Sequence, residues 1–400
     1  MRIGVLSESR PGERRVALPP DAVTALCAAE DTTVIVQAGA GRHLHATDDD
    51  YRAVGAQIAD SAESIAAEVD LLTVVNPPEA SVITAMRPGS SLLGLLNPFQ
   101  EHRAMLTARD HGVTTYALEL VPRISRAQSV DALSSQALVA GYRAALVGAD
   151  LLPRFFPLFM TAAGTIPPAR VLVLGAGVAG LQAIATARRL GAVVSGYDVR
   201  AAAADEVRSL GATFIELNLE TQEGTGGYAK SQSADFASRQ HAALAPYVAD
   251  ADVVITTAAI PGRTAPLLVT EEMVAKMRPG SVVVDLAAQS GGNCALSKPG
   301  ETGVFGGVSV WGGADVPSQL PVHASKLYGA NISAFVALLK AGDEQDEILS
   351  GSRVTQGGRF VHEAVRKALA PDEPEPEPAV KTEPAAQPGP DRTDEPEQGE

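Results

Sequence analysis

Residues 171–190 read Val171-Leu-Val-Leu-Gly175-Ala-Gly177-Val-Ala-Gly180-Leu-Gln-Ala-Ile-Ala-Thr-Ala-Arg-Arg-Leu190. An aliphatic run, a glycine-rich turn and a helical pattern follow one another, which predicts a strand, a tight turn and a helix. Gly175 permits the turn, Gly177 lets a pyrophosphate approach the backbone, and Gly180 lets the helix pack closely on the strand. The stretch therefore predicts a dinucleotide site, in which the first N–H groups of the helix, at Val178 and Ala179, face the phosphates.

An acidic residue stands where such a site needs one. A second predicted strand, 193–198, ends at Asp198, 18 residues after Gly180. A carboxylate there accepts hydrogen bonds from both adenosine-ribose hydroxyls and repels a 2′-phosphate, which favours NAD(H) over NADP(H), with Val199 as a neighbouring contact. Arg200 keeps the second possibility open, because its guanidinium can meet a 2′-phosphate. A glycine-rich strand, turn and helix that binds nothing is the other alternative.

The alternation of short apolar runs and helical stretches extends over residues 1–370. Strands are predicted at 2–6, 33–37, 71–75, 91–96 and 113–120, and then at 171–174, 193–198, 213–217, 252–257, 281–286 and 303–311. Helices are predicted at 20–29, 49–56, 61–68, 132–149 and 324–341, and a hairpin at 354–361. Strands that alternate with helices form parallel sheets. We therefore predict an α/β fold of two Rossmann-like parallel-sheet domains joined by long helices.

The predicted first domain is discontinuous and comprises residues 1–138 together with 326–370, whereas the second comprises 139–325. Residues 371–400 contain ten acidic residues against Lys381 and Arg392, a net charge of −8, and many prolines. Such a composition cannot bury enough apolar surface to fold, so we expect a disordered acidic tail.

Charge and motif content exclude several kinds of partner. The chain carries 32 basic and 47 acidic residues, a net charge of −15, which argues against a nucleic-acid partner and against a polybasic membrane anchor. Its two cysteines, Cys27 and Cys294, lie far apart, and no C-x-x-C or H-E-x-x-H motif is present. No metal site is predicted.

A second segment combines charged and polar residues. It reads Pro122-Arg-Ile-Ser-Arg-Ala-Gln-Ser-Val-Asp-Ala-Leu-Ser-Ser-Gln136. This segment is very similar to the Arg-Gln-Asp loop of the peripheral NAD(H)-binding component of proton-translocating NAD(P) transhydrogenases. The resemblance continues through 160–170, the fingerprint, 226–230, 270–280 and 291–294, and it covers residues 1–345.

The resemblance implies an NAD(P) transhydrogenase of the Si-/Re-specific, proton-translocating type. In such an enzyme, hydride passes directly from C4 of NADH to C4 of NADP⁺ on a partner component, so catalysis is mostly proximity and orientation. By resemblance, Arg123, Gln128 and Asp131 are the catalytic candidates and border the nicotinamide. Asp131 and Ser134 would fix the carboxamide or ribose, and Gln128 would reach toward the partner's nucleotide.

The resemblance also places Gly227 and Tyr228 on a loop that closes over the site. Without the resemblance, Arg123 and Asp131 would be interpreted as a structural ion pair, and Tyr228 as an ordinary exposed loop residue. The implied cofactor is NAD(H). The implied partners are NADP(H)-binding and transmembrane subunits on separate chains, in addition to a second copy in a homodimer. The chain would lie in the cytoplasm, peripheral on the inner face of the bacterial membrane, with no direct membrane insertion.

Alanine dehydrogenase is the nearest competing family, because it shares the fold and the pattern Glu13-Arg-Arg-Val-Ala17. Its substrate needs a lysine at the end of an early strand and a catalytic histidine, but the corresponding stretches here contain Asn76 and Asn97. We therefore expect Arg15 to be structural. A third possibility is an NAD-sensing module without turnover. One segment departs from the transhydrogenase pattern, since residues 312–318 read Gly-Gly-Ala-Asp-Val-Pro-Ser, and the contacts it makes are left open.

Overall fold

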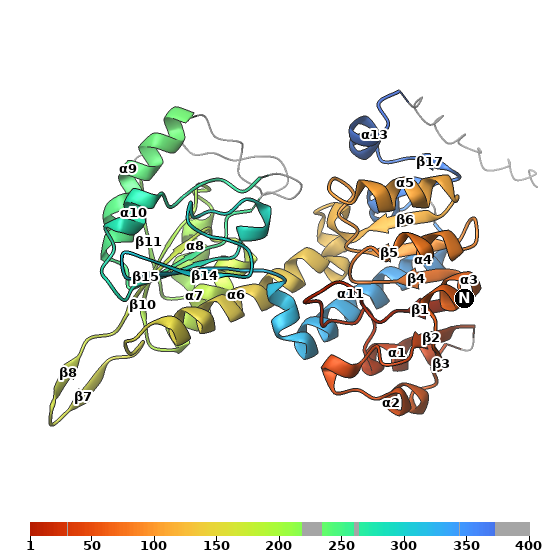
Figure 1. Ribbon diagram of the computed structural model, residues 1–400, viewed down its shortest axis with the longest axis horizontal. Coiled ribbons are helices and arrows are strands. Elements are labelled where there is room, and N and C mark those ends of the chain that lie inside the picture. The colour runs from red at the N-terminus through yellow and green to blue at the C-terminus, as the bar shows by residue number, and fades with distance from the viewer. Residues whose placement is uncertain (30, 218–233, 260–263, 344, 373–400) are drawn as a thin grey trace, which may run out of the picture.

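The computed structural model describes residues 1–29, 31–217, 234–259, 264–343 and 345–372. Two sheets covered by helices lie side by side, and the long helices α6 (Ala132–Leu151) and α11 (Pro321–Ala341) run between them (Figure 1). The predicted α/β class is thereby confirmed. Within the described ranges, no helix is long and apolar enough to cross a membrane. The predicted tail lies outside the described residues from 373 onward.

The first sheet has eight strands in the order β17-β16-β6-β5-β4-β1-β2-β3. Its parallel strands are β1 (Arg2–Val5), β2 (Thr33–Gln37), β3 (Gln57–Ala59), β4 (Leu71–Thr73), β5 (Ser91–Gly94) and β6 (Thr114–Ala117), and β16 (Arg353–Gln356) and β17 (Arg359–Phe360) add an antiparallel edge. Its helices are α1 (Pro20–Cys27), α2 (Asp48–Ala53), α3 (Ala62–Glu68), α4 (Ala80–Ala85), α5 (His102–Asp110), α12 (Glu347–Ser352) and α13 (Glu363–Leu369), with 3₁₀ turns η1 (Arg42–Leu44), η2 (Leu118–Leu120) and η3 (Ser125–Val130).

The second sheet has seven strands in the order β11-β10-β9-β12-β13-β15-β14. Its strands are β9 (Arg170–Leu174), β10 (Val193–Tyr197), β11 (Thr213–Phe214), β12 (Val253–Thr256), β13 (Val282–Asp285), the antiparallel β14 (Thr302–Phe305) and β15 (Val308–Gly312). Its helices are α7 (Val178–Arg189), α8 (Ala203–Ser209), α9 (Ala234–Asp250) and α10 (Glu271–Ala275), with 3₁₀ turns η5 (Ala288–Ser290) and η6 (Val316–Gln319). The parallel strands thus follow the order of a dinucleotide-binding fold, in which the ligand lies outside their carboxyl ends.

Most predicted elements form, although the structure also contains β3 and several helices that were not predicted, and three further regions differ from expectation. The single strand predicted at 303–311 is wrong, because Gly306 and Gly307 adopt φ of 59° and 85° and turn the chain into the antiparallel pair β14 and β15. The strand predicted at 113–120 ends at Ala117 and continues as η2. A two-stranded hairpin of β7 (Phe159–Thr161) and β8 (Gly164–Ile166), which the sequence analysis missed, projects from the second unit (Figure 1).

The two long helices connect the hydrophobic cores, because α6 begins with Ala132 in the core of the first sheet and continues into the core of the second. In α6, Ala144, Ala145 and Val147 pack among the central strands of the second sheet. In α11, Tyr328, Ile332, Phe335 and Val336 pack against the first sheet. The helices also contact each other, since the Gln136 side chain donates to the Ala324 carbonyl at 3.1 Å. The predicted domain boundaries at 138/139 and 325/326 fall inside these helices and stay a prediction.

Helices α6 and α7 approach each other more closely than side chains would allow. A methyl group added to Gly141 of α6 would lie 2.0 Å from the carbonyl oxygen of Ala179, in the first turn of α7. Only glycine fits there without a backbone shift. The contact fixes the start of α7, and with it the glycine-rich turn, relative to α6.

We expect Gly141→Ala to destabilise the protein, although alanine is favoured over glycine in an unconstrained helix by about 1 kcal/mol. Overpacking of this kind lowers the free energy of unfolding by about 1–3 kcal/mol, so the midpoint temperature of thermal unfolding should fall by several degrees. Gly177→Ala is the control, because no described atom lies within 4 Å of the added methyl group. A Gly141→Ala protein that is as stable as the unaltered chain would show that the helices can separate freely.

Candidate dinucleotide site

The three fingerprint glycines, Gly175, Gly177 and Gly180, differ in their backbone conformation and in the space around them. Gly175 has a φ of 100°, which places it in the left-handed region and turns the chain at the end of β9. A methyl group on Gly180 would lie 1.8 Å from the Gly175 carbonyl oxygen, so strand and helix could not pack. At Gly177, by contrast, an added methyl group would meet only open space among the described residues. That space lies directly before the first turn of α7.

The start of α7 has the properties of a phosphate-binding helix end. Among the described residues no side chain caps the helix at Gly177, so its first N–H groups keep no intrahelical or capping acceptor. Val178 is 41% exposed and Ala179 is half-buried at this end. Unpaired N–H groups and the positive end of the helix dipole together attract phosphate oxygens.

Asp198 follows β10 and lies beside the glycine-rich turn. Its Oδ2 accepts from the Ala176 N–H at 2.8 Å, and its Oδ1 accepts from the Arg200 N–H at 2.9 Å. The Arg200 guanidinium donates to both oxygens, from Nε to Oδ1 and from Nη2 to Oδ2, each at 2.9 Å. Burial raises the pKa of the Asp198 carboxyl, but the hydrogen bonds from Arg200 and Ala176 outweigh it and hold the pKa below its ordinary value. The carboxyl is therefore ionised at neutral pH.

The segment 122–134 leads into α6 and combines a fixed cap with exposed side chains. Asp131 is the N-cap of α6, where its carboxylate accepts from both the N–H and the hydroxyl of Ser134. Arg123 and Gln128 are exposed, and the Gln128 amide has no hydrogen-bond partner in the part of the chain that the structure describes. Asp131 and Ser134 are thus held in place, whereas the Gln128 side chain is available to an incoming group.

Helix geometry places this segment within reach of the fingerprint. Ser134 stands seven residues before Gly141, the residue of α6 that touches Ala179. At a rise of 1.5 Å per residue, Ser134 lies about 10 Å and Asp131 about 15 Å along α6 from the contact with the start of α7. A dinucleotide whose pyrophosphate sits at α7 can therefore extend one nucleoside toward Asp131 and Ser134.

A pocket of about 540 Å³ lies between the two units. The loop after β1, with Arg14, forms one wall, and the segment after β15, with Asp315, forms the other. Arg143 of α6 contributes to the lining and donates from Nε to the Gln319 side chain at 2.9 Å. Both loops follow the carboxyl ends of parallel strands, so the carboxyl ends of the two sheets face a common space. The sequence analysis did not identify Arg14, Arg143 and Asp315 as site residues. It did note that residues 312–318 depart from the transhydrogenase pattern, and this segment forms one wall of the pocket.

Arg15 takes part in a buried network rather than facing this space. Its guanidinium forms an ion pair with Glu13 at 2.7 Å and donates to the Gln136 side chain at 2.9 Å. Burial raises the pKa of Glu13, but its contacts with Arg15 outweigh this and lower the pKa to about 2. Asn76 and Ser318 also donate to the Glu13 carboxylate. Every charge in this network has its partner inside the protein, as expected of a structural Arg15.

Two further carboxyls lie at the ends of first-sheet strands, and the sequence analysis did not single them out. Glu8 accepts from the N–H groups of Val75 and Asn76, and Glu119 accepts from those of Leu96 and Asn97. Burial raises the pKa of each carboxyl to about 7. Each carboxyl ties the end of its own strand to the end of a neighbouring one. Glu8 follows the strand predicted at 2–6, whereas Glu119 lies inside the strand predicted at 113–120, so only Glu8 carried a positional signal, and the burial of both depends on tertiary packing.

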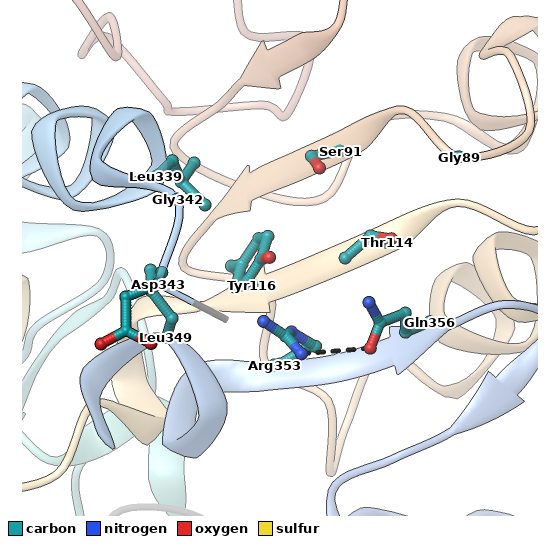
Figure 2. Close-up of a pocket in the computed structure, with 10 residues that line it drawn as sticks. All are labelled: Gly89, Ser91, Thr114, Tyr116, Leu339, Gly342, Asp343, Leu349, Arg353 and Gln356. Atoms are coloured by element: carbon teal, nitrogen blue, oxygen red, sulfur yellow. Dashed lines mark hydrogen bonds between the residues drawn. The ribbon is translucent and has the colours of Figure 1, made fainter. Parts of the chain in front are cut away.

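A second cavity, of about 260 Å³, lies at the other end of the first sheet (Figure 2). Figure 2 shows Arg353 and Gln356 of β16, hydrogen-bonded to each other, near Tyr116 and Thr114 of β6. Thr114 and Ser91 begin their strands, so this cavity borders the amino ends of the sheet. Open α/β sheets bind their ligands at the carboxyl ends, and the interdomain pocket is therefore the better candidate.

Two predicted site residues, Gly227 and Tyr228, lie outside the described residues. No group of three or more histidine, cysteine, aspartate or glutamate side chains in the described ranges could hold a metal ion. Among the described residues, the fingerprint, Asp198 and Val199 lie around the start of α7 and the end of β10, and Arg123, Gln128, Asp131 and Ser134 lie in the segment that leads into α6.

The fold and this arrangement define a dinucleotide-binding protein of two α/β units. The chain belongs to the alanine dehydrogenase/PNT family: residues 4–140 match the model "Alanine dehydrogenase/PNT, N-terminal domain", and residues 144–363 match its C-terminal counterpart. The protein is 45% identical to the first portion of the NAD(P) transhydrogenase subunit alpha of Rhodospirillum rubrum over 380 residues, which span 91% of this chain and 99% of the relative.

A solved transhydrogenase structure and an alanine dehydrogenase, which represents the other branch of the family, are also similar to this chain. A transhydrogenase structure from Sinorhizobium meliloti superposes with a TM-score of 0.81 at 41% identity and covers 91% of this chain and 100% of that one. Alanine dehydrogenase of Mycobacterium tuberculosis is 34% identical over 302 residues, which span 75% of this chain and 76% of the relative. The chain is thus more similar to these transhydrogenase subunits than to this alanine dehydrogenase.

We expect the Gly177→Ala protein to bind NADH at least 10-fold more weakly, while the midpoint temperature of its thermal unfolding changes little. The added methyl group fills the space that a pyrophosphate would use, and it meets no protein atom among the described residues. Isothermal titration with NADH measures the effect. Unchanged NADH affinity in a folded Gly177→Ala protein would place the pyrophosphate elsewhere.

Proposed function

We propose that the protein is the NAD(H)-binding subunit of a proton-translocating transhydrogenase. NADH supplies a hydride from its C4 to C4 of NADP⁺ held on a separate chain, which leaves NAD⁺ and NADPH and exchanges no proton at that step. A membrane component on another chain couples this reaction to proton translocation. The names of the relatives support an enzyme of several chains, since the Rhodospirillum rubrum protein is named as one portion of a subunit alpha.

The observation that carries the proposal is the absence of a free acid–base pair for a small substrate at the positions that correspond to the dehydrogenase lysine and histidine. Asn76 and Asn97 occupy the corresponding stretches, and Arg15 is committed to Glu13. Glu8 and Glu119 have raised pKa values, but each accepts two main-chain N–H groups. Oxidation of an amine requires removal of a proton, whereas hydride exchange between two nicotinamides does not.

The described residues fit the roles that such an exchange requires. The start of α7 and Gly177 would hold the pyrophosphate, and Asp198 the adenosine ribose. Asp131 and Ser134, fixed at the α6 cap, would hold the nicotinamide end, with Arg123 at its border. The exposed Gln128 amide can both donate and accept, so it could keep the two nucleotides in register. Most of the catalytic effect is then orientation.

Two other functions are tested with the purified chain, first alone and then mixed with the NADP(H)-binding component. An alanine dehydrogenase would form NADH from NAD⁺ and alanine without a partner. An NAD-sensing module would bind NADH and show no turnover with any partner. We expect neither outcome: the pure chain binds NADH, oxidises no amino acid, and exchanges hydride once the NADP(H)-binding component is added. We further propose that it acts in the cytoplasm, peripheral to the membrane through its partners.

The exposed hairpin supports a homodimer. Side chains of Phe159, Met160 and Ile166 on β7 and β8 are 41%, 75% and 42% exposed, and Phe155 and Leu158 before them are also exposed. An isolated two-stranded hairpin is at best marginally stable in water. We propose that a second copy of the chain covers this hairpin.

For the transfer step, we expect Gln128→Asn to lower NADH affinity only a few-fold. The shorter side chain misplaces the amide, so the single-turnover rate of hydride transfer should fall roughly 10- to 100-fold. Stopped-flow mixing with the NADP(H)-binding component measures this rate. Ser125→Ala, on the same exposed turn, is the matched control. A normal rate in Gln128→Asn, or a defect confined to NADH affinity, would remove Gln128 from the catalytic residues.

For the dimer, we expect Met160→Asp to shift the protein toward monomer in sedimentation-velocity experiments at micromolar concentration, because a charge is costly to bury in an interface. Val304→Asp is the matched control, since Val304 is a similarly exposed apolar residue on the edge strand β14. A monomeric unaltered protein, or a dimer that is indifferent to Met160→Asp, would contradict the assignment.

A further inference from the structure

The carboxylate of Asp198 has no acceptor capacity left. A carboxylate offers about four acceptor positions on its two oxygens. Here two are used by the main-chain N–H groups of Ala176 and Arg200, and two by Nε and Nη2 of the Arg200 guanidinium. The side chain of Asp198 is only 8% exposed, so water cannot add a further donor freely.

An adenosine ribose needs two of these four positions. The two main-chain donors belong to the turn after β9 and to the segment that follows β10, so they move only if the backbone moves. The guanidinium is a side chain that is a quarter exposed and can swing away. The two hydrogen bonds that a ribose can replace are therefore those of Arg200, and the guanidinium occupies the place of the two hydroxyls.

We infer that Arg200 determines nucleotide specificity in this protein, by closing the ribose position in the free state and by remaining beside it as a ligand for a 2′-phosphate. This inference rests on the proposed NAD(H) function and names the residue that sets its selectivity. The ionised Asp198 favours a ribose with two free hydroxyls and repels a phosphate. Arg200 has the opposite effect to Asp198 on each nucleotide. It weakens NAD(H) binding because it competes with the ribose hydroxyls, and it strengthens NADP(H) binding because it attracts the 2′-phosphate.

The inference predicts opposite changes for the two nucleotides. Arg200→Met keeps the apolar stem and removes the competing donor, so we expect NADH to bind roughly 3- to 10-fold more tightly and NADPH several-fold more weakly. Asp198→Asn removes the repelling charge while Arg200 stays. For this variant we expect NADH to bind roughly 10- to 100-fold more weakly and NADPH at least 10-fold more tightly.

The decisive variant carries both substitutions. If the gain in NADPH affinity of Asp198→Asn comes from Arg200, the double variant Asp198→Asn/Arg200→Met loses that gain. Isothermal titration with NADH and NADPH at fixed low salt measures all four proteins, and thermal unfolding shows that each is folded. Arg208→Met is the matched control, since Arg208 lies on α8 and pairs with Asp205 and Glu216 instead. Its affinities for both nucleotides should equal those of the unaltered chain.

Each outcome supports or overturns the inference. A double variant that binds NADPH as tightly as Asp198→Asn, or an Arg200→Met protein with both affinities unchanged, would show that the arginine has only a structural role. Unaltered protein that binds no NADH at all would instead refute the proposed function. The two failures are therefore distinguishable within one set of titrations.

Discussion

The close contact between Gly141 and Ala179 is the constraint on which the candidate site depends. It allows α6, which begins at the Asp131 cap, to lie directly against the helix that follows the glycine-rich turn. One rigid helix therefore sets the spacing between a phosphate-binding helix end and the exposed loop that carries Gln128. Without that spacing, the helix end and the loop could not hold the two ends of the same dinucleotide.

The two long helices also explain why the site lies between two units. Helix α6 runs from the first core into the second, and the loops that line the interdomain pocket follow the carboxyl ends of strands in both sheets. In a dehydrogenase of this architecture that space would hold a small substrate and its proton-transferring groups. Here Glu13 and Arg15 of the first unit pair with each other, and hydride exchange with a second nucleotide is the chemistry that we propose.

The sequence predicted those features that depend on the local backbone. Glycines at 175 and 180 have roles that a turn and a helix–strand contact impose at fixed spacing, so fold class and fingerprint were accessible. Side-chain partners were not accessible in this way. Asp198 was expected to face a ribose, yet Arg200 occupies both of its oxygens, and only tertiary geometry decides such a competition. The β14–β15 turn at Gly306 and Gly307 carried a usable signal that was missed. The hairpin at 159–166 carried none, since its exposed strands find no core in this chain.

The central claim is that hydride leaves this chain directly for a nicotinamide on a partner. The most direct test mixes the protein and the NADP(H)-binding component with NADP⁺ and with NADH that carries deuterium at both C4 positions. Direct transfer predicts NADPH with one deuterium at C4 and none released to water. NADPH without deuterium, deuterium in the solvent, or NADH formation from alanine by the chain alone would contradict the account.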